Sequence, residues 1–582
     1  MRSIWADARR NHRAEQGQPP EPGQASAAES SAATEAPAEA LTTAVVEDRA
    51  PRADVADQPG DRYQTGFSRW WSAGLAVAAG LTLAGAFPPV GIWPLAIAGP
   101  ALLTAALWRK RPLMSFVLGL ISGGVFFFAL LSWLVNVAWY AWAVLAVLET
   151  LIFAVMALAL PLLMRRPAWP LAVAGWWVAQ EAVRDRFPWG GFPWGRLAMS
   201  QASAPTAGWA TVGGLPVLTF LLALSGACLA YLVIKSRADG PVSLRTLGAL
   251  GLAALGAPLV LLGNQLLVWV PSPGPSAVVA TIQGNVPHSR NLPDQLRATT
   301  VTANHTAATA ALAAAVRAGR RPVPDVVIWP ENSTDIDPSQ SRPTFDTISL
   351  AVAAIDRPVL VGAVLSNPQR NAGQLWLPSH GPTQLYVKRK LVPFGEVIPY
   401  RHFLELFTSL PKLQPHDFTP GHKAVVFKIG KIRLGDVICY EVGFDNLVRS
   451  EVTAGANLLA VQTNDADFEL DGQTGETGQQ LEMARMDAIT TGRSVAVAST
   501  IGISALIEPN GAILAQTKTW QRAELDARLP LVSELTPADH AGDWPELIIV
   551  VLTAVALLWS AASGIAQSRS GRRPGPSGAG VS

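Results

Sequence analysis

The sequence predicts a membrane-embedded α-helical bundle of about eight helices joined to a separate α/β domain. Apolar residues (A, V, I, L, M, F, W, Y, C) make up 49% of the 582 residues, and charged residues make up only 15%, against about 25% in a typical soluble protein. Long apolar runs crowd the first half of the chain and recur once near its end, and short β-branched runs fill the interval. These observations exclude a disordered chain, a collagen and an ordinary cytosolic enzyme.

The N-terminal segment, residues 1–62, is rich in Ala, Pro, Glu, Gln and Ser and has almost no aromatic residues. Such a segment buries too little apolar surface to offset its ordering entropy, so we expect a disordered tail. It is not a signal peptide, because the first apolar run begins only near Trp70.

Each apolar run that follows is close to the roughly 20 residues needed to cross the hydrocarbon core. Helices are expected at 71–88, 91–108, 113–135, 138–164, 168–184, 208–234, 246–270 and 545–567. They give a bundle of seven helices over residues 63–270 and an eighth helix over 544–568, with a second disordered tail at 569–582.

The charge of the connecting loops predicts the orientation. Basic residues lie before the first helix and after the second, fourth, sixth and eighth, at Arg69, Arg109, Lys110, Arg111, Arg165, Arg166, Lys235, Arg237, Arg245, Arg569, Arg572 and Arg573. The alternate loops at 88–91 and 135–140 carry neither Lys nor Arg. Because positive loops stay in the cytoplasm, both termini are expected inside and residues 271–543 outside. In a bacterium this is the outer face of the inner membrane.

The outer segment has the pattern of a single α/β domain with two or four layers. Strands are expected at Ala277–Gln283, Asp325–Trp329, Pro358–Val364, Val425–Ile429, Leu434–Cys439, Leu458–Gln462 and Val495–Ser499. Helices are expected at Val301–Ala318 and Gly478–Gly492. The sequence contains no internal repeat and no nucleotide- or metal-binding motif, so neither a cofactor nor a metal is expected.

The two cysteines differ in their surroundings. Cys228 lies inside the sixth apolar run and is interpreted as a small buried apolar residue. Cys439 ends an apolar strand and is followed by Tyr440 and Glu441. The end of a strand holds a nucleophile rigidly above the sheet, although a cysteine in that position, taken alone, is more often structural.

Two further segments carry candidate polar residues. Glu331 follows the apolar run 325–329 and Pro330, which cannot continue a strand ladder. Lys388 lies eight residues before Glu396 in Lys-Arg-Lys-Leu-Val-Pro-Phe-Gly-Glu. Taken alone, a Glu after a strand is usually a solvated loop residue, and the basic residues around Lys388 are compatible with an exposed strand face.

Taken together, Glu331 in Trp-Pro-Glu-Asn, Lys388 before Glu396, and Cys439 in Ile-Cys-Tyr-Glu resemble the Glu-Lys-Cys triad of the carbon–nitrogen hydrolase (nitrilase) superfamily. The eight-helix frame, Gly191-Phe-Pro-Trp194 and Gly542-Asp-Trp-Pro545 make the chain most similar to the membrane branch of that superfamily, the bacterial apolipoprotein N-acyltransferases. The resemblance implies a nitrilase-like α-β-β-α sandwich for residues 271–543.

The resemblance also implies a two-step acyl transfer. Cys439 would take an acyl chain from a membrane phospholipid as a thioester and pass it to the α-amine of a diacylglyceryl-cysteine at a lipoprotein N-terminus. Glu331 would act as the base, and Lys388 would hold it and stabilise the oxyanion. Glu396 and Glu441 would support them by positioning Lys388 or aiding proton transfer, unless they form only salt bridges. The backbone N–H of Tyr440 is a candidate second oxyanion donor.

Two positions depart from the pattern of the family. Asp467 stands where a Trp is usual, and Ile501 lies where an Asn pair often precedes Gly502. Both loops are expected to border the site, so acyl-chain or acceptor preference could differ.

The expected partners are phospholipid, lipoprotein and bilayer, with the chain acting as a monomer. No nucleic acid is expected, because the net charge is only +2. Two other functions stay open. One is a membrane-tethered amidase or hydrolase that uses the same triad with water as acceptor. The other is a transporter or scaffold with an inactive outer domain.

Overall fold

The computed structural model describes residues 66–570 apart from 166–167, 239–271, 273, 288–292, 407, 410–411, 413–415, 467 and 469–472. The tail expected at 1–62 and the seventh helix expected at 246–270 lie outside the described residues, as do Asp467 and residues 571–582.

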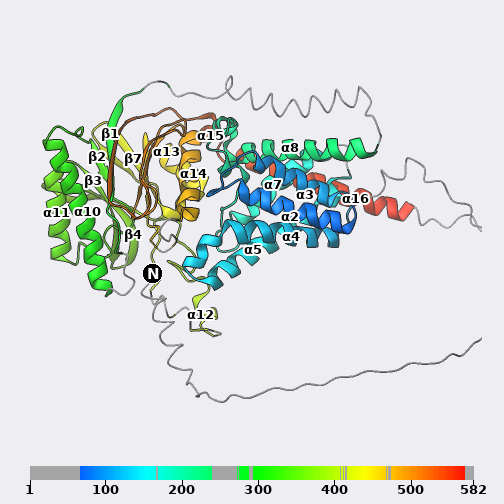
Figure 1. Cartoon of the computed structure of the whole chain (residues 1–582), viewed down its shortest axis with the longest axis horizontal. Helices are drawn as coiled ribbons and strands as arrows, with labels where there is room; N and C mark the ends of the chain where they lie inside the picture. The colour runs from blue at the N-terminus through cyan, green and yellow to red at the C-terminus, as the bar shows by residue number, and fades with distance from the viewer. Residues whose placement is uncertain are drawn as a thin grey trace, which may run out of the picture.

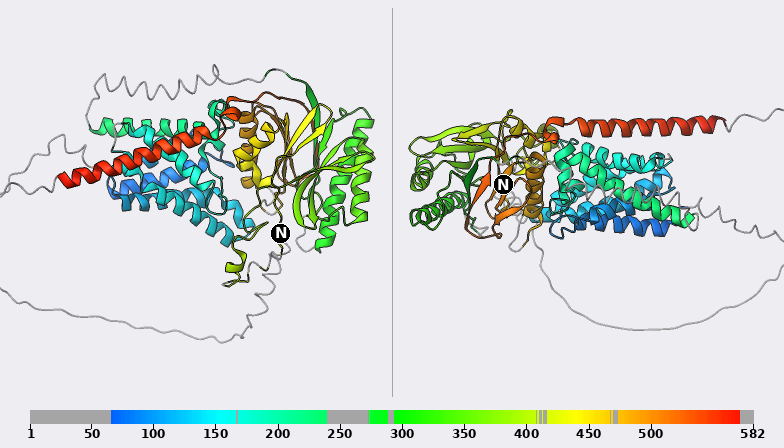
Figure 2. Two further views of the ribbon diagram at one scale, coloured as in Figure 1. Left: turned by 180° about the vertical axis from the view of Figure 1, so that it is seen from behind. Right: turned by 90° about the horizontal axis from the view of Figure 1, so that it is seen from above.

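The helices of the N-terminal half pack side by side as a bundle, and the last helix runs along it (Figures 1 and 2). They are α2 (Arg69–Gly85), α3 (Leu95–Leu107), α4 (Pro112–Leu130), α5 (Trp139–Ala157), α6 (Leu160–Leu163), α7 (Trp169–Arg184), α8 (Ala210–Ala238) and α16 (Trp544–Ser570). Phe127, Phe153, Trp176 and Trp177 meet ring to ring in the bundle core. The apolar runs of the sequence are thus buried in part against one another.

Four stretches among the described residues are long and apolar enough to cross a membrane: Pro112–Leu130, Trp139–Leu163, Ala207–Lys235 and Trp544–Ser563. The prediction of several helices that could span a membrane is therefore confirmed, while the count of eight stays a prediction. The helix predicted at 113–135 was too long. It ends at Leu130, and a 3₁₀ turn, η1 (Ser132–Asn136), follows. There Asn136 donates to the Phe468 carbonyl, 2.7 Å away, so the chain turns toward the second domain.

The second domain holds two six-stranded sheets, with strand orders β12-β1-β2-β3-β4-β5 and β11-β10-β9-β8-β7-β6. The strands of the first sheet are β1 (Ser276–Gln283), β2 (Val326–Ile328), β3 (Val359–Ser366), β4 (Gln369–Leu377), β5 (Gly381–Val387) and β12 (Ala523–Pro530). Those of the second are β6 (Val426–Ile429), β7 (Ile432–Ile438), β8 (Leu458–Thr463), β9 (Ser494–Ser499), β10 (Ala505–Ile507) and β11 (Ile513–Gln516).

The two sheets face each other, and helices cover their outer faces, which makes a four-layered α-β-β-α sandwich (Figure 1). Buried residues of both sheets, such as Leu360 and Leu434, form one apolar cluster between them. On the first sheet lie α10 (Asp294–Arg317) and α11 (Arg342–Ile355), which are far from the bundle. On the second lie α13 (Asp445–Thr453) and α14 (Gly475–Thr491), which face it.

Seven strands lie where the sequence predicts them, and five, namely β4, β5, β10, β11 and β12, were not predicted. β4, for example, reads QRNAGQLWL, with polar residues at its start. It is a strand because it pairs with β3 on one side and β5 on the other. The predicted end of β7 was also wrong: the strand ends at Ile438, and Cys439 begins a 3₁₀ turn, η5 (Cys439–Gly443).

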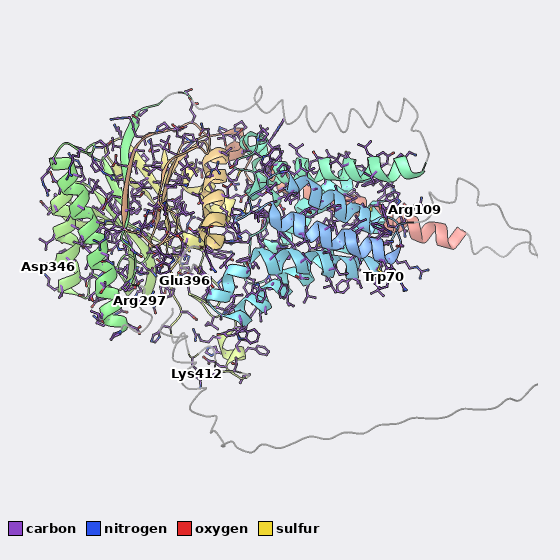
Figure 3. All side chains as sticks on the ribbon, in the orientation of Figure 1. Trp70, Arg109, Arg297, Asp346, Glu396 and Lys412 are labelled. Atoms are coloured by element: carbon purple, nitrogen blue, oxygen red, sulfur yellow. The ribbon has the colours of Figure 1, made fainter. Side chains whose placement is uncertain are left out.

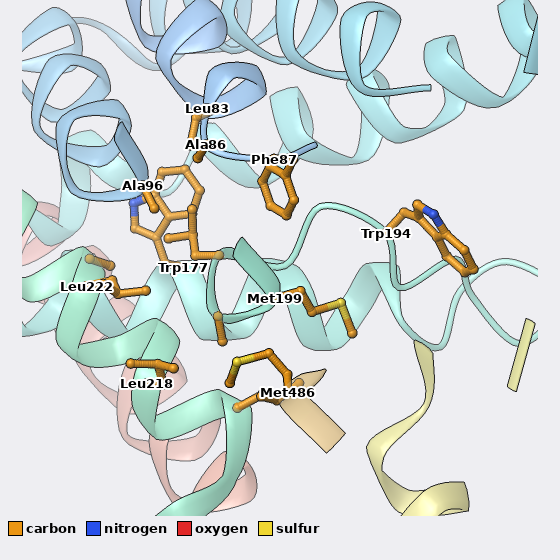
Figure 4. Packing of buried hydrophobic residues seen from close by; sticks show 14 of the residues in the cluster. Leu83, Ala86, Phe87, Ala96, Trp177, Trp194, Met199, Leu218, Leu222 and Met486 are labelled. Atoms are coloured by element: carbon orange, nitrogen blue, oxygen red, sulfur yellow. The ribbon is translucent and has the colours of Figure 1, made fainter. Parts of the chain in front are cut away.

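The bundle and the sheet domain share one apolar cluster. The segment between α7 and α8 includes η2 (Leu197–Ser200) and η3 (Ala207–Trp209), and it lies against α14. Met199 of η2 lies near Met486 of α14 and Leu218 of α8 (Figure 4). The face of the second sheet that carries η5 and α14 is therefore the face that meets the membrane helices.

Candidate active site

Cys439 lies at a sharp turn between β7 and η5. Its backbone φ is +53°, in the left-handed region that a residue with a Cβ enters only at a cost. Its side chain is buried at 7% exposure. The turn therefore holds the thiol in a fixed, strained position above the end of the strand.

Glu441 secures this turn. Its Oε2 accepts hydrogen bonds from the Ile438 N–H and the Tyr386 hydroxyl, both at 2.8 Å. Its Oε1 accepts from the N–H groups of Arg389 at 2.6 Å and Lys390 at 2.9 Å. The Glu441 carboxylate thus joins the cysteine turn to the backbone next to Lys388. It positions that backbone and, among the described residues, makes no hydrogen bond to the Lys388 ammonium.

Lys388 follows β5 and is buried at 1% exposure. Its Nζ lies 3.0 Å from Glu331 Oε1 and 3.0 Å from Glu396 Oε1. Burial alone lowers the pKa of Lys388, but the two carboxylates outweigh it and hold the pKa well above its ordinary value. The lysine is therefore an ammonium shared by two carboxylates.

Asn371 on β4 completes this group and was not predicted. Its Nδ2 donates to Glu331 Oε1 at 2.7 Å and to Glu396 Oε1 at 2.9 Å. No local pattern marks it, because it is one of several polar residues at the start of a strand that the sequence did not indicate. It lies in the site because β4 pairs with β5, which ends just before Lys388.

Glu331 follows β2 and places its second oxygen toward the loop after β8. Its Oε2 accepts from the Asn464 N–H at 3.0 Å. Burial raises the pKa of Glu331, Lys388 opposes that rise, and Glu396 adds to it. A carboxylate with a raised pKa is a stronger base, so it suits proton transfer from a thiol.

Burial also holds the pKa of the Cys439 thiol well above its ordinary value, with a smaller contribution in the same direction from Glu331 and an opposing one from Lys388. The resting cysteine is therefore a neutral thiol. It becomes a nucleophile only when its proton leaves, and this requires a base in the site.

Gln480 on α14 is a further residue that the sequence did not single out. Its Nε2 lies 3.6 Å from Cys439 Sγ and also donates to Glu476 Oε1. The helix that carries Gln480 was predicted. That Gln480 faces the sulfur depends on the packing of α14 against η5.

Tyr440 connects the turn to the bundle. Its hydroxyl donates to the Gly191 carbonyl at 2.6 Å, and its ring stacks on those of Trp194 and Phe192. The Gly191–Trp194 segment that the sequence singled out thus packs against the residue next to the cysteine. The role of the Tyr440 N–H as an oxyanion donor stays a prediction.

Two further positions that the sequence singled out are Ile501 and Cys228. Ile501 is buried with Val286, Val301 and Ala466 in a small apolar cluster. Cys228 lies in α8, apart from the triad. Among the described residues, no group of three or more His, Cys, Asp or Glu side chains is arranged to hold a metal ion.

Comparison with known proteins gives two matching family models. Residues 79–228 match the apolipoprotein N-acyltransferase N-terminal domain, and residues 278–533 match the carbon–nitrogen hydrolase family. An apolipoprotein N-acyltransferase of Mycolicibacterium smegmatis is 34% identical over 504 residues, which is 83% of this chain and 84% of the relative. One of Pseudomonas putida is 30% identical over 511 residues, 84% of this chain and 96% of the relative.

A crystal structure of an amidase from Nesterenkonia sp. aligns with 46% of this chain and 94% of the amidase, at 17% identity and a TM-score of 0.32. The two family models together match both the bundle and the sheet domain, and each of the two relatives matches more than four-fifths of this chain.

Proposed function

The chain belongs to the apolipoprotein N-acyltransferase family, a group of acyltransferases, and we propose that it transfers a fatty acyl chain from a phospholipid to the N-terminal α-amine of lipoproteins. The observation that carries this proposal is the position of Cys439. The cysteine lies close enough to the buried Glu331–Lys388 pair to interact with both charges, and it is next to Tyr440, which contacts the helical bundle. A thiol at the junction of a hydrolase domain and apolar helices suits substrates that reside in the bilayer.

In the first step, Glu331 accepts the proton of the Cys439 thiol as the sulfur attacks an acyl ester of the phospholipid. Lys388 holds Glu331 in place at 3.0 Å and donates to the oxyanion that develops. The C–O bond breaks, Glu331 returns the proton to the departing lysophospholipid oxygen, and a thioester remains on Cys439.

In the second step, the neutral α-amine of a diacylglyceryl-cysteine attacks the thioester carbonyl. The C–N bond forms, the C–S bond breaks, and Glu331 moves a proton from nitrogen to the departing sulfur. Glu396 supports both steps because it shares the Lys388 ammonium, and Glu441 supports them because it fixes the turn that carries Cys439. The proposed mechanism uses no metal and no cofactor, and the chain acts as a monomer.

The proposed location is the bacterial inner membrane, with the sheet domain on the outer face and both termini in the cytoplasm. Arg109 lies at the end of the bundle that is remote from the sheet domain (Figure 3). It is followed by Lys110 and Arg111. A basic turn at that end supports a cytoplasmic position for it.

The test is mass spectrometry of the purified protein after incubation with phospholipid and no acceptor. We expect an acyl adduct on Cys439 that hydroxylamine removes and that a diacylglyceryl-cysteine peptide discharges. The Cys439→Ala variant should form none. Discharge by water alone would favour the hydrolase, and the absence of an adduct from folded protein supplied with varied lipids would refute acyl transfer.

A further inference from the structure

Helix α14 brings a second polar pair to the Cys439 sulfur. The Gln480 side-chain amide donates from one nitrogen to Sγ, 3.6 Å away, and to Oε1 of Glu476, one helical turn earlier. A side-chain NH₂ group has two hydrogens, so one amide can hold both partners. Glu476 and Gln480 are both buried, at 1% and 4% exposure. The carboxylate of Glu476 therefore lies one amide group away from the reacting atom.

This pair changes the charge balance of the site. Lys388 is already shared between Glu331 and Glu396, and Glu476 adds a further carboxylate close enough to act on Cys439. After burial and Glu331, Glu476 is among the groups that raise the pKa of the Cys439 thiol. A surplus of negative charge opposes a resting thiolate and attracts a positively charged group that approaches the sulfur.

The proposed acceptor is such a group. An α-amine has an ordinary pKa of about 7.7–8.0, so most of it is an ammonium at neutral pH. An ammonium has no lone pair and cannot attack a thioester. One proton must leave before the second step begins, and Glu331 is already engaged in moving the next proton from nitrogen to sulfur.

We propose, building on the proposed function, that Glu476 binds the α-ammonium of the lipoprotein acceptor and takes its surplus proton, with Gln480 holding the carboxylate beside the thioester. The ammonium becomes a neutral amine and Glu476 a carboxylic acid. The amine then forms the amide as the C–S bond breaks, and Glu476 releases its proton to water. The second step thus yields the amide, the free thiol and one proton.

Besides Glu476, other titratable groups act on the Cys439 thiol or on Lys388 beside it, among them Glu441 of η5. Cys439 comes from η5, Asp465 from the loop after β8, and Glu331 with Lys388 from the first sheet. Asp465 is occupied by hydrogen bonds from the hydroxyls of Thr463 and Ser499, at 2.8 and 2.6 Å. Glu331 serves the sulfur, and Gln480 links Glu476 to the same sulfur, so Glu476 is the carboxylate placed to take the ammonium proton.

The test separates the two half-reactions in the Glu476→Gln variant of the full-length protein. Phospholipid alone should still load the thioester on Cys439. Discharge by a diacylglyceryl-cysteine peptide should be at least tenfold slower than in the unsubstituted protein at pH 7. The deficit should shrink above pH 8.5, where the peptide amine is already neutral, and Glu476→Asp should restore part of the rate at pH 7.

Glu482→Gln is the matched control, because Glu482 lies on the same helix and pairs with Arg485 at 2.5 Å. It should discharge at the unsubstituted rate. Normal discharge by Glu476→Gln at pH 7, an equal deficit at every pH, or a failure of this variant alone to load the thioester would each overturn the inference. A thioester missing from the unsubstituted protein as well would instead overturn the proposed function, and the inference with it.

Discussion

Two of the buried charge clusters among the described residues are the site around Lys388 and the junction around Arg196. At the first, one ammonium is shared by Glu331 and Glu396 beside a thiol on a strained turn. At the second, Arg196 binds both oxygens of Asp445, at 2.5 and 3.0 Å, and lies 3.3 Å from Asp185. Both cations are almost fully buried.

The difference between the regions lies in what the charges face. Lys388 stands next to the proposed nucleophile, whereas Arg196 joins the segment after α7 to the first residue of α13. A buried ion cluster is therefore not in itself a sign of catalysis. In the proposed mechanism the first cluster prepares a reaction, whereas the second joins the bundle to the element that follows the cysteine turn. Substitutions in the two regions should separate loss of chemistry from loss of docking.

The largest effect is expected from Lys388→Met. The change removes the proposed oxyanion donor, whose loss typically costs about 10²–10³ in rate, and it leaves two carboxylates without their cation. We expect acyl transfer to fall by at least that factor while the protein stays folded in detergent, as measured by thioester formation and by size-exclusion chromatography. Retention of more than about a tenth of the rate would contradict the role of Lys388.

Arg196→Met should produce the largest loss of stability at the junction. Removing one partner of a buried ion pair typically costs about 3–5 kcal/mol. We expect a lower free energy of unfolding in detergent, followed by tryptophan fluorescence. Activity should fall less than in Lys388→Met, because the triad is intact.

The matched control for this variant is Arg449→Met. Arg449 pairs with Asp543 at 2.6 Å, and Asp543 is 67% exposed, so the loss should stay within about 1 kcal/mol. Equal losses in the two variants would show that the Arg196 pair does not hold the domains together.

Tyr440→Phe should have a smaller effect on the same junction. It removes the hydrogen bond to the Gly191 carbonyl, worth about 1 kcal/mol, and keeps the stack on Trp194. We expect a small drop in thermal stability and a loss of turnover of only a few fold. A loss as large as that of Lys388→Met would mean that the hydroxyl takes part in the chemistry.

The smallest effect is expected from Cys228→Ala in α8. Cys228 lies away from the triad and acts as a small apolar side chain. Thioester formation on Cys439 should be unchanged, and Cys228 should carry no acyl adduct in the mass spectrum. An adduct on Cys228 in the unsubstituted protein would contradict its assignment as a packing residue.

The sequence alone determined the features that depend on neighbours along the chain. Apolar runs near 20 residues indicated the membrane helices, β-branched runs located seven strands, and short motifs indicated Glu331, Lys388 and Cys439. These signals are local, because a helix or a buried strand imposes its own periodicity on consecutive residues.

Only the tertiary structure decided which other polar residues join the site. Asn371 reaches Glu331 across 40 residues, Gln480 reaches Cys439 across 41, and Arg196 reaches Asp445 across 249. None of these residues stands out in composition or spacing. Their partners depend on the pairing of β4 with β5, on the side of α14 that faces η5, and on the contact between bundle and sheet domain. These long-range contacts are fixed by packing, and no stretch of consecutive residues encodes them.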